Sequence, residues 1–236
     1  DPQPVSPKQQ QQQQQLAAMN PQANIPPPKS PEEQRYIPPV NYRDVGKVMA
    51  KILDSEVVGH AMPFEQRETL KKKIVPGKLL RGGHIDFLDD PRVICNPRTI
   101  LNLRFEADRK KWEGYGVRYI QLTAGKAFEK YNIETKEVRD WMVATVKTIS
   151  FLRRESLPLF VHCRYGKDRT GIVVACILLL LGFPKYIIIM EYLQSVEGVV
   201  KQKWIEKILN EMPDDPVLAR EQFPGTNFEN LEHLFR

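Results

Sequence analysis

Apolar residues recur three or four positions apart in several stretches of the chain, as they do on the buried face of a helix. Residues 136–152 show this pattern clearly, with apolar side chains at Val138, Trp141, Met142, Val146 and Ile149. We therefore expect a helix there. Comparable patterns predict helices over residues 42–53, 64–73, 170–181, 185–196 and 202–211.

Short runs of β-branched and other apolar residues lie between the predicted helices. They predict extended segments over residues 77–80, 99–103, 117–122 and 157–162. Strands that alternate with helices indicate an α/β domain. In such domains, ligands bind where loops leave the carboxyl ends of the strands. The strand predicted over residues 157–162 ends directly before Cys163.

The first 40 residues have a different composition from the rest. They hold ten of the 19 prolines and the glutamine run over residues 9–15. Such a segment buries little and cannot pair its backbone regularly. We expect residues 1–40 to be an N-terminal extension, disordered or strapped over a folded domain of residues 41–236. Charges cancel within residues 1–40, so the formal net charge of +6 belongs to the folded domain.

Composition and hydropathy exclude several classes of protein. With 42% hydrophobic and 27% charged residues, the chain is neither collagen-like nor disulfide-rich. The apolar run over residues 172–181 is about half of the ~20 residues needed to span a bilayer, which argues against a transmembrane protein. The basic charge implies an anionic partner. Because the chain opens at Asp1 without Met, we favour a secreted or periplasmic location over a cytoplasmic one.

The candidate chemistry lies just after the strand predicted over residues 157–162. Cys163 and Arg169 stand six positions apart, with Gly166 between them and Gly171 opening an apolar helix. A tight turn at a helix N-terminus directs backbone N–H groups at one oxyanion, and the helix dipole adds positive potential. This environment favours the thiolate of Cys163 and makes it a nucleophile. The planar fork of Arg169 is suited to hold two phosphoryl oxygens at once.

Residues 162–170 resemble the signature of the cysteine-dependent protein tyrosine phosphatase superfamily, with the compact dual-specificity-like branches as the best fit. The resemblance covers about residues 75–210, including residues 76–82 and 99–104. It implies one phosphatase domain with a central mixed sheet, flanking helices, and a phosphate-binding loop between a strand end and a helix N-terminus. It further implies a phosphocysteine at Cys163, phosphate binding by Arg169, and assistance of the thiolate by Thr170. No metal or cofactor is implied.

The sequence departs from the family's usual pattern at the general acid. The usual acid is an aspartate in the stretch between Asp108 and Asp140, and this chain has no aspartate there. Glu129 and Glu134 are candidates in that stretch, although the helix dipole alone explains an acidic residue at Glu134. The loop also contains Asp168. Its surroundings resemble those of bacterial lipid-phosphatase-like members, in which the loop aspartate is the candidate acid. We therefore assign Asp168 as acid and base.

Cations near the loop bear on the substrate. Arg164 and Lys167 lie within it, and Lys126 and Lys130 precede the helix predicted over residues 136–152. Several cations suit an inositol polyphosphate or a phosphoinositide headgroup, and the lysine-containing loop resembles those of inositol-phosphate phosphatases, the phytase-like ones included. For Lys126 and Lys130, an equally good interpretation is that they are ordinary lysines on a solvent-exposed surface. The alternatives are a protein tyrosine or dual-specificity phosphatase and a non-enzymatic phosphate-binding module.

The remaining candidates have simpler interpretations. His162 is expected to orient the loop by a hydrogen bond to backbone, and Tyr165 either stacks on a substrate or walls the pocket. Cys95 and Cys176 are expected to be packing residues. The other histidines lack metal-ligand spacing, and no interleaved aromatic and basic motif indicates nucleic acid. The expected substrate-binding residues are His162, Arg164, Tyr165, Gly166, Lys167, Gly171, Lys126 and Lys130.

Overall fold

The computed structural model describes residues 38–109, 112–123, 135–196 and 202–236 of the chain. By the density of its contacts, the chain divides into Asp1–Tyr36 and Ile37–Arg236. Every described residue belongs to the second unit. The extension predicted over residues 1–40 lies almost entirely outside the described residues and stays a prediction.

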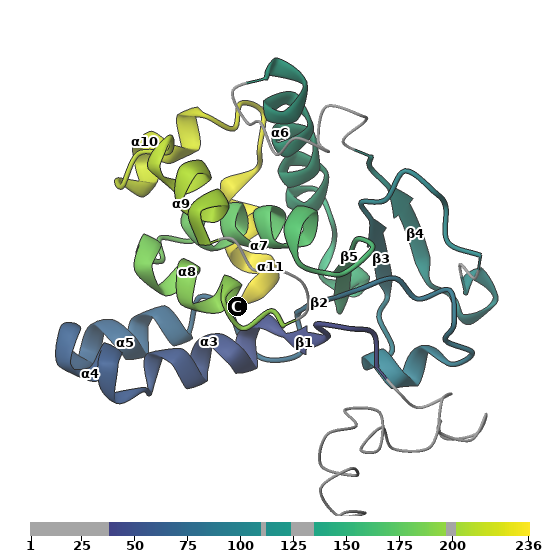
Figure 1. Ribbon diagram of the computed structural model, residues 1–236, viewed down its shortest axis with the longest axis horizontal. Coiled ribbons are helices and arrows are strands. Elements are labelled where there is room, and N and C mark those ends of the chain that lie inside the picture. Colours follow the sequence, from purple (N-terminus) through teal and green to yellow (C-terminus); the bar gives the residue numbers. More distant parts are fainter. Residues whose placement is uncertain (1–37, 110–111, 124–134, 197–201) are drawn as a thin grey trace, which may run out of the picture. The chain divides into compact units, whose positions relative to one another are not determined.

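A five-stranded mixed sheet forms the centre of this unit (Figure 1). The strands are β1 (Arg43–Asp44), β2 (Leu79–Gly82), β3 (Thr99–Asn102), β4 (Arg118–Gln121) and β5 (Leu159–His162), in the order β1-β2-β5-β3-β4. Strands β2, β5, β3 and β4 are parallel, and β1 is antiparallel to β2. The predicted α/β fold with a mixed central sheet is therefore confirmed.

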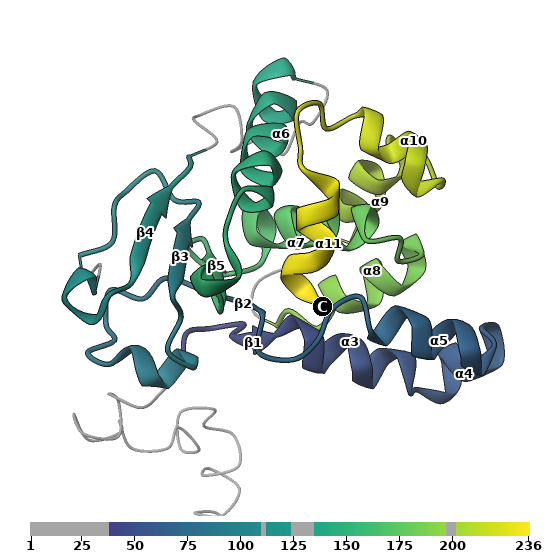
Figure 2. The same ribbon diagram turned by 180° about the vertical axis from the view of Figure 1, so that it is seen from behind.

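The two faces of the sheet are covered differently. Helices pack on one face, where Leu159 and Val161 of β5 join their apolar residues in a large core. Phe160, between them in sequence, points to the other face, as alternation along a strand requires. That second core contains Leu88 and Trp112 from connecting segments instead of α-helices. Figure 2 shows the same arrangement from behind.

All six predicted helices are present, with shifted ends. The helices are α3 (Val45–Leu53), α4 (Glu56–Ala61), α5 (Phe64–Lys71), α6 (Lys136–Ser150), α7 (Asp168–Leu180), α8 (Lys185–Tyr192), α9 (Gln202–Asn210), α10 (Pro216–Glu221) and α11 (Phe228–Phe235). Short 3₁₀ segments are η1 (Pro91–Ile94), η2 (Glu113–Tyr115) and η4 (Arg154–Ser156). Among the described helices, none is long and apolar enough to cross a bilayer.

The helix predicted over residues 42–53 begins later than expected. Asp44 accepts a hydrogen bond from the Lys47 N–H and thereby caps α3, so the residues before it are free to leave the helix. Arg43 instead pairs with Arg81 in the antiparallel strand β1. Helices α4, α10 and α11 were not predicted. They are six to eight residues long, and Ser55, Asp215 and Asn227 cap their first turns.

Helix α7 is apolar nearly all round and is buried along most of its length. Cys176 lies within it, and burial raises the pKa of that thiol to about 12, which agrees with a packing role. The same expectation for Cys95 was wrong. Cys95 is exposed and adopts a left-handed backbone conformation (φ 57°) at the end of η1, so its side chain leaves the core.

Candidate active site

The central strand β5 delivers Cys163 to the carboxyl edge of the sheet. His162, its last residue, lies in register with Gly82 of β2 and Asn102 of β3. The chain then turns through residues 163–167 and enters α7 at Asp168. Cys163 is 3% exposed. The predicted loop between a strand end and a helix N-terminus is therefore present, and Asp168 and Arg169 belong to the first turn of the helix.

The turn requires glycine at one position. Gly166 has a positive φ of 63°, and a Cβ atom there would lie 2.1 Å from the Gly82 carbonyl carbon. The backbone of the loop is thus packed directly on the end of β2. Gly171 is also constrained, because a Cβ atom there would lie 2.6 Å from the Tyr192 ring. Both predicted glycines serve close packing of the loop and its helix.

Arg81 of β2 holds the loop from below. This fully buried side chain donates hydrogen bonds to the carbonyl oxygens of Gly166 (2.9 Å) and Lys167 (3.3 Å). In a trans peptide the N–H group points away from the carbonyl of the same unit. With the two carbonyls turned toward Arg81, the N–H groups of Lys167 and Asp168 are directed to the opposite side. The loop thus offers donors for an oxyanion.

Glu191 of α8 neutralises the buried charge of Arg81. Its carboxylate lies 2.6 Å from Arg81 Nη1 and 2.8 Å from Arg43 Nε. Burial by itself would raise the pKa of Glu191, but the two guanidinium groups lower it below the usual range. Burial lowers the pKa of Arg81 to about 10, with Glu191 opposing the shift, so both groups are charged at neutral pH. Sequence reasoning missed this pair.

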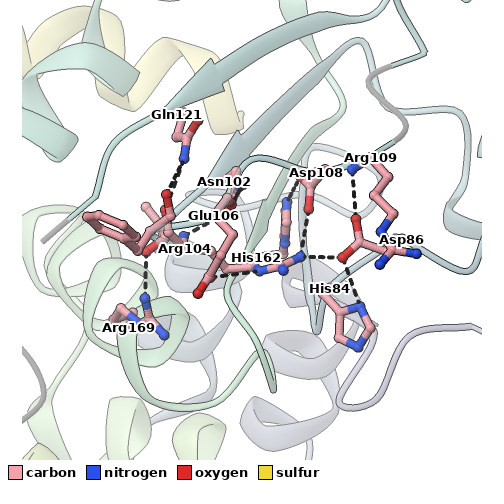
Figure 3. Close-up of polar contacts among 12 residues, drawn as sticks. His84, Asp86, Asn102, Arg104, Glu106, Asp108, Arg109, Gln121, His162 and Arg169 are labelled. Carbon is pink, nitrogen blue, oxygen red and sulfur yellow. Dashed lines mark hydrogen bonds and ion pairs between the residues drawn. The ribbon is translucent and has the colours of Figure 1, made fainter. Parts of the chain in front are cut away.

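Arg169 is tied to the strand next to β5. Its Nη1 donates a hydrogen bond to the Leu103 carbonyl at 3.0 Å, just after β3 (Figure 3). The side chain is therefore held at the carboxyl edge of the sheet, where Cys163 also lies. Its remaining N–H groups belong to a rigid planar fork, the geometry that binds two phosphoryl oxygens.

His162 has a different partner from the one expected. Its Nε2 lies 2.8 Å from Asp108 Oδ2, and both side chains are fully buried. The ring stacks on Phe160 at a centroid distance of 5.4 Å. The predicted hydrogen bond from the ring to backbone is absent among the described residues. A carboxylate from the segment after β3 orients His162 instead.

Asp108 belongs to a polar network that sequence reasoning missed (Figure 3). Arg104 Nη1 lies 3.0 Å from Asp108 and 2.7 Å from Asp86, and the Tyr119 hydroxyl donates to Asp108 at 3.1 Å. Asp86 also accepts a hydrogen bond from the Arg109 N–H. Burial by itself would raise the pKa of Asp86, but the hydrogen bonds from Arg109 and Arg104 lower it below the usual range. The network joins the segments after β2 and β3 to the base of the Cys163 loop.

The other loop side chains differ in exposure. Lys167 is buried, with 6% of its surface exposed, whereas Arg164 is exposed and lies over the Tyr165 ring at 5.5 Å. Tyr165 is half exposed. Its carbonyl accepts a hydrogen bond from Asn41 Nδ2. Lys167 is thus the additional cation that the fold encloses within the loop itself.

Asp168, the predicted acid, and Thr170, the predicted helper of the thiolate, each have a buried side-chain oxygen without a hydrogen bond among the described residues. These atoms are Asp168 Oδ1 and Thr170 Oγ1. Tyr192 lies near Asp168: burial raises the pKa of Tyr192, and the Asp168 charge raises it further. Other predicted residues, namely Lys126, Lys130, Glu129 and Glu134, lie outside the described residues.

A sequence model of the tyrosine phosphatase family matches residues 39–235. The chain belongs to the tyrosine phosphatase family. A curated relative, the triple specificity protein phosphatase PtpB of Mycobacterium tuberculosis, is 45% identical over 42 residues, which cover 18% of this chain and 15% of that protein. The predicted family is confirmed.

Two solved structures are also similar to the chain. The catalytic core of the PP-IP phosphatase SIW14 from S. cerevisiae, in complex with citrate, is 18% identical with a TM-score of 0.43. The match covers 80% of this chain and 97% of that one. A second Siw14 catalytic core is 17% identical with a TM-score of 0.47, covering 80% and 96%.

Membership in the tyrosine phosphatase family makes this chain a cysteine-dependent phosphatase. The structure adds how its parts are supported. Cys163 follows the central strand, Arg169 is held by the segment after β3, and Arg81 fixes the loop backbone. Each support comes from a different strand, so the loop geometry depends on the three adjacent strands β2, β5 and β3.

Proposed function

We propose that this phosphatase hydrolyses phosphomonoesters of inositol polyphosphates or phosphoinositides through a phosphocysteine intermediate. The supporting observation is the burial of Lys167 in the loop that leads into Arg169, with Arg164 exposed in the same loop. A substrate with one phosphate needs one guanidinium group that binds two of its oxygens. A substrate with several phosphates binds more tightly with each further cation near the site. The triple specificity in the name of the Mycobacterium tuberculosis relative agrees with a range beyond phosphotyrosine.

In the first step, the Cys163 thiolate attacks the phosphorus of the substrate. The bond between phosphorus and the ester oxygen breaks, and that oxygen takes a proton from the Asp168 carboxyl as it leaves. Arg169 binds two equatorial oxygens and the loop N–H groups bind the charge that develops on them. Thr170 Oγ1, buried and without another partner among the described residues, is available to stabilise the thiolate.

In the second step, the phosphocysteine is hydrolysed. Asp168, now a carboxylate, accepts a proton from a water molecule that attacks the phosphorus. The sulfur–phosphorus bond breaks, the Cys163 thiolate is restored, and inorganic phosphate leaves. Asp168 suits both steps because its Oδ1 is not committed to a structural hydrogen bond among the described residues.

A second candidate function is dephosphorylation of phosphotyrosine proteins. Exposed aromatic side chains favour it. Phe87 and Phe105 lie on the segments that follow β2 and β3, and Tyr165 lies in the loop itself. These segments leave the same edge of the sheet as Cys163, so an aryl phosphate or an apolar peptide could contact them.

Phosphate release from three substrates decides between the two functions. Inositol hexakisphosphate, a soluble phosphoinositide and a phosphotyrosine peptide are compared with reductant and EDTA present, and the Cys163→Ser chain is the control. We expect the inositol compounds to exceed the peptide by about tenfold in kcat/KM, or about 1.4 kcal/mol of transition-state binding. A peptide that wins by that margin would assign the chain to phosphoprotein substrates.

A Lys167→Gln variant tests the supporting observation directly. It should lower kcat/KM for inositol hexakisphosphate by about tenfold or more, while p-nitrophenyl phosphate, with one phosphate, loses less. Equal losses on both substrates would mean that Lys167 only shapes the loop. Lys203→Gln, an exposed lysine on α9, is the matched control.

A further inference from the structure

A cavity of about 670 Å³ lies at the amino edge of the sheet, opposite the Cys163 loop. It is lined by Arg98, Gly116, Arg118, Arg153, Glu155, Ser156 and Leu157. Arg98 precedes β3, Arg118 opens β4, and Leu157 precedes β5. The parallel strands run from this edge to the catalytic edge. Between Leu157 and Cys163 the chain advances through six residues, roughly 20 Å if extended.

Backbone hydrogen bonds fix the walls of this cavity relative to one another. The Arg98 N–H donates to the Pro158 carbonyl at 2.9 Å, and the Arg118 N–H donates to the Arg98 carbonyl at 2.8 Å. The turn of η4 is closed by the Ser156 N–H, which donates to the Arg153 carbonyl. The backbone that carries the three arginines is therefore fixed, and their exposed side chains project from it.

The cavity gathers positive charge that the fold does not neutralise. Among the described residues, no side chain forms an ion pair or hydrogen bond with the guanidinium groups of Arg98, Arg118 or Arg153. Several other arginines are paired with carboxylates, as at Arg104 with Asp86 and Arg220 with Glu232. Among the described lining residues, Glu155 is the one that carries a carboxylate. Neighbouring unpaired guanidinium groups repel one another, and an anion with several phosphates removes that repulsion.

A smaller hollow of about 190 Å³ adjoins the first and shares Arg98 with it. Its other lining residues are apolar or uncharged, and include Pro91, Pro97 and Tyr115. Tyr115 is 63% exposed. The side of the cavity next to Arg98 therefore offers an aromatic surface on which a planar ring can stack.

We propose that the cavity bounded by Arg98, Arg118 and Arg153 is a second anion site, which binds the polyphosphate group of a small molecule away from Cys163. The shared chemistry is a chain or cluster of phosphates. A nucleoside polyphosphate would place its base at Tyr115, and an inositol polyphosphate would use the arginines alone. This site does not depend on the identity of the substrate hydrolysed at Cys163.

Amide chemical shifts of the full chain test the proposal site by site. The Cys163→Ser chain is titrated with sodium tripolyphosphate, and the amide signals of Gly116, Arg118 and Ser156 are followed beside those of residues 163–169. We expect both groups of signals to move and saturate. The added substitutions Arg98→Gln and Arg118→Gln should weaken the response at Gly116 and Ser156 by about tenfold or more, while the Cys163 loop still responds.

A charge-matched control separates the site from general electrostatics. Lys51→Gln with Arg139→Gln removes the same two positive charges from exposed positions on α3 and α6. That control should leave the response at Gly116 and Ser156 intact. Turnover of p-nitrophenyl phosphate by the Arg98→Gln/Arg118→Gln chain with Cys163 present should be unchanged, which shows that the chain is folded.

The outcomes decide the proposal. It is overturned if signals at Gly116 and Ser156 do not saturate, or if the control weakens them as much as the cavity variant does. If the proposal holds, adenosine triphosphate and inositol hexakisphosphate identify the source of the phosphates. Tighter binding of adenosine triphosphate than of tripolyphosphate, abolished by Tyr115→Ala, indicates a nucleotide. Tighter binding of inositol hexakisphosphate that is unaffected by Tyr115→Ala indicates an inositol phosphate.

Discussion

At the scale of single residues, Asp108 connects the polar network to the loop. It contacts His162, and it is paired with Arg104 within the fold. His162 immediately precedes Cys163, the proposed nucleophile, and is fully buried. Asp108 therefore acts through His162 and is a positioning residue. Its loss should change the orientation of the loop that carries Cys163, while Cys163 itself remains present.

Asp108→Asn should reduce kcat by about tenfold or more and change the pH profile of kcat, because His162 loses its charged partner. KM should change less. The control is Glu106→Gln, which alters an exposed carboxylate 3.7 Å from Arg104 and should have little effect. A fall in stability with an unchanged pH profile would reduce Asp108 to a structural residue.

Asp168→Asn tests proton donation to the leaving group. We expect kcat for an alkyl phosphate to fall by about 10²-fold, since an alkoxide needs a proton as it leaves. The loss for p-nitrophenyl phosphate should be much smaller, because nitrophenolate is a stable leaving group. If Asp168→Asn retains nearly full turnover of the alkyl phosphate, another residue is the acid, and Glu129 and Glu134 are the next to replace.

At the scale of elements, the loop over residues 163–167 is held by β2 below and by α8 behind. Arg81 connects all three, since it donates to two loop carbonyls and pairs with Glu191. Removing one partner of a buried ion pair is much more costly than removing a surface pair, about 3–5 kcal/mol. The geometry of the loop over residues 163–167 is therefore coupled to the packing of α8 against the sheet.

Gly166→Ala should abolish turnover while leaving the rest of the fold intact. The new Cβ atom would meet the Gly82 backbone at 2.1 Å in a left-handed conformation, so the loop must shift and its N–H groups lose their alignment. Gly114→Ala is the matched control, because a Cβ atom there meets nothing within 4 Å. Turnover of p-nitrophenyl phosphate and vanadate binding measure the result. Near-normal activity would show that the loop tolerates the shift.

At the scale of the whole molecule, buried charge makes stability depend on pH. The pKa values of Glu191 and Asp86 are lowered, so these carboxyls bind protons less readily when folded than when unfolded. Their contribution to stability is complete above the ordinary carboxyl pKa of about 4 and is lost as the pH falls through the lowered values. Burial and Arg104 lower the pKa of His84, which acts in the same direction below about pH 6.5.

Urea unfolding between pH 7 and pH 3 measures this dependence. The free energy of unfolding should decline below about pH 4, and less steeply in Glu191→Gln, which lacks one of the carboxyls with a lowered pKa. At pH 7, Glu191→Gln should be destabilised by about 3–5 kcal/mol, because Arg81 and Arg43 lose their shared carboxylate. Glu221→Gln, exposed on α10, should match the unaltered chain. A parallel decline in both variants would contradict the assignment to Glu191.

The sequence by itself determined the features that depend on neighbours along the chain. The alternation of strands and helices indicated the α/β fold, and Cys163, Gly166 and Arg169 indicated a phosphate-binding loop at a helix N-terminus. Such features can be predicted from the sequence because periodicity and turn chemistry act over a few neighbouring residues. Even so, the helix ends moved with capping, as Asp44 shows at α3.

Only the tertiary structure decided which distant residues meet. Arg81 and Glu191 are 110 positions apart, yet they form one buried pair beneath the loop. Asp108 reaches His162, and Arg98 and Arg153 share a cavity, because the parallel strand order places their segments side by side. Any of these residues, seen alone in the sequence, is an ordinary charged residue. Its role comes from long-range packing of the sheet, which no local pattern encodes.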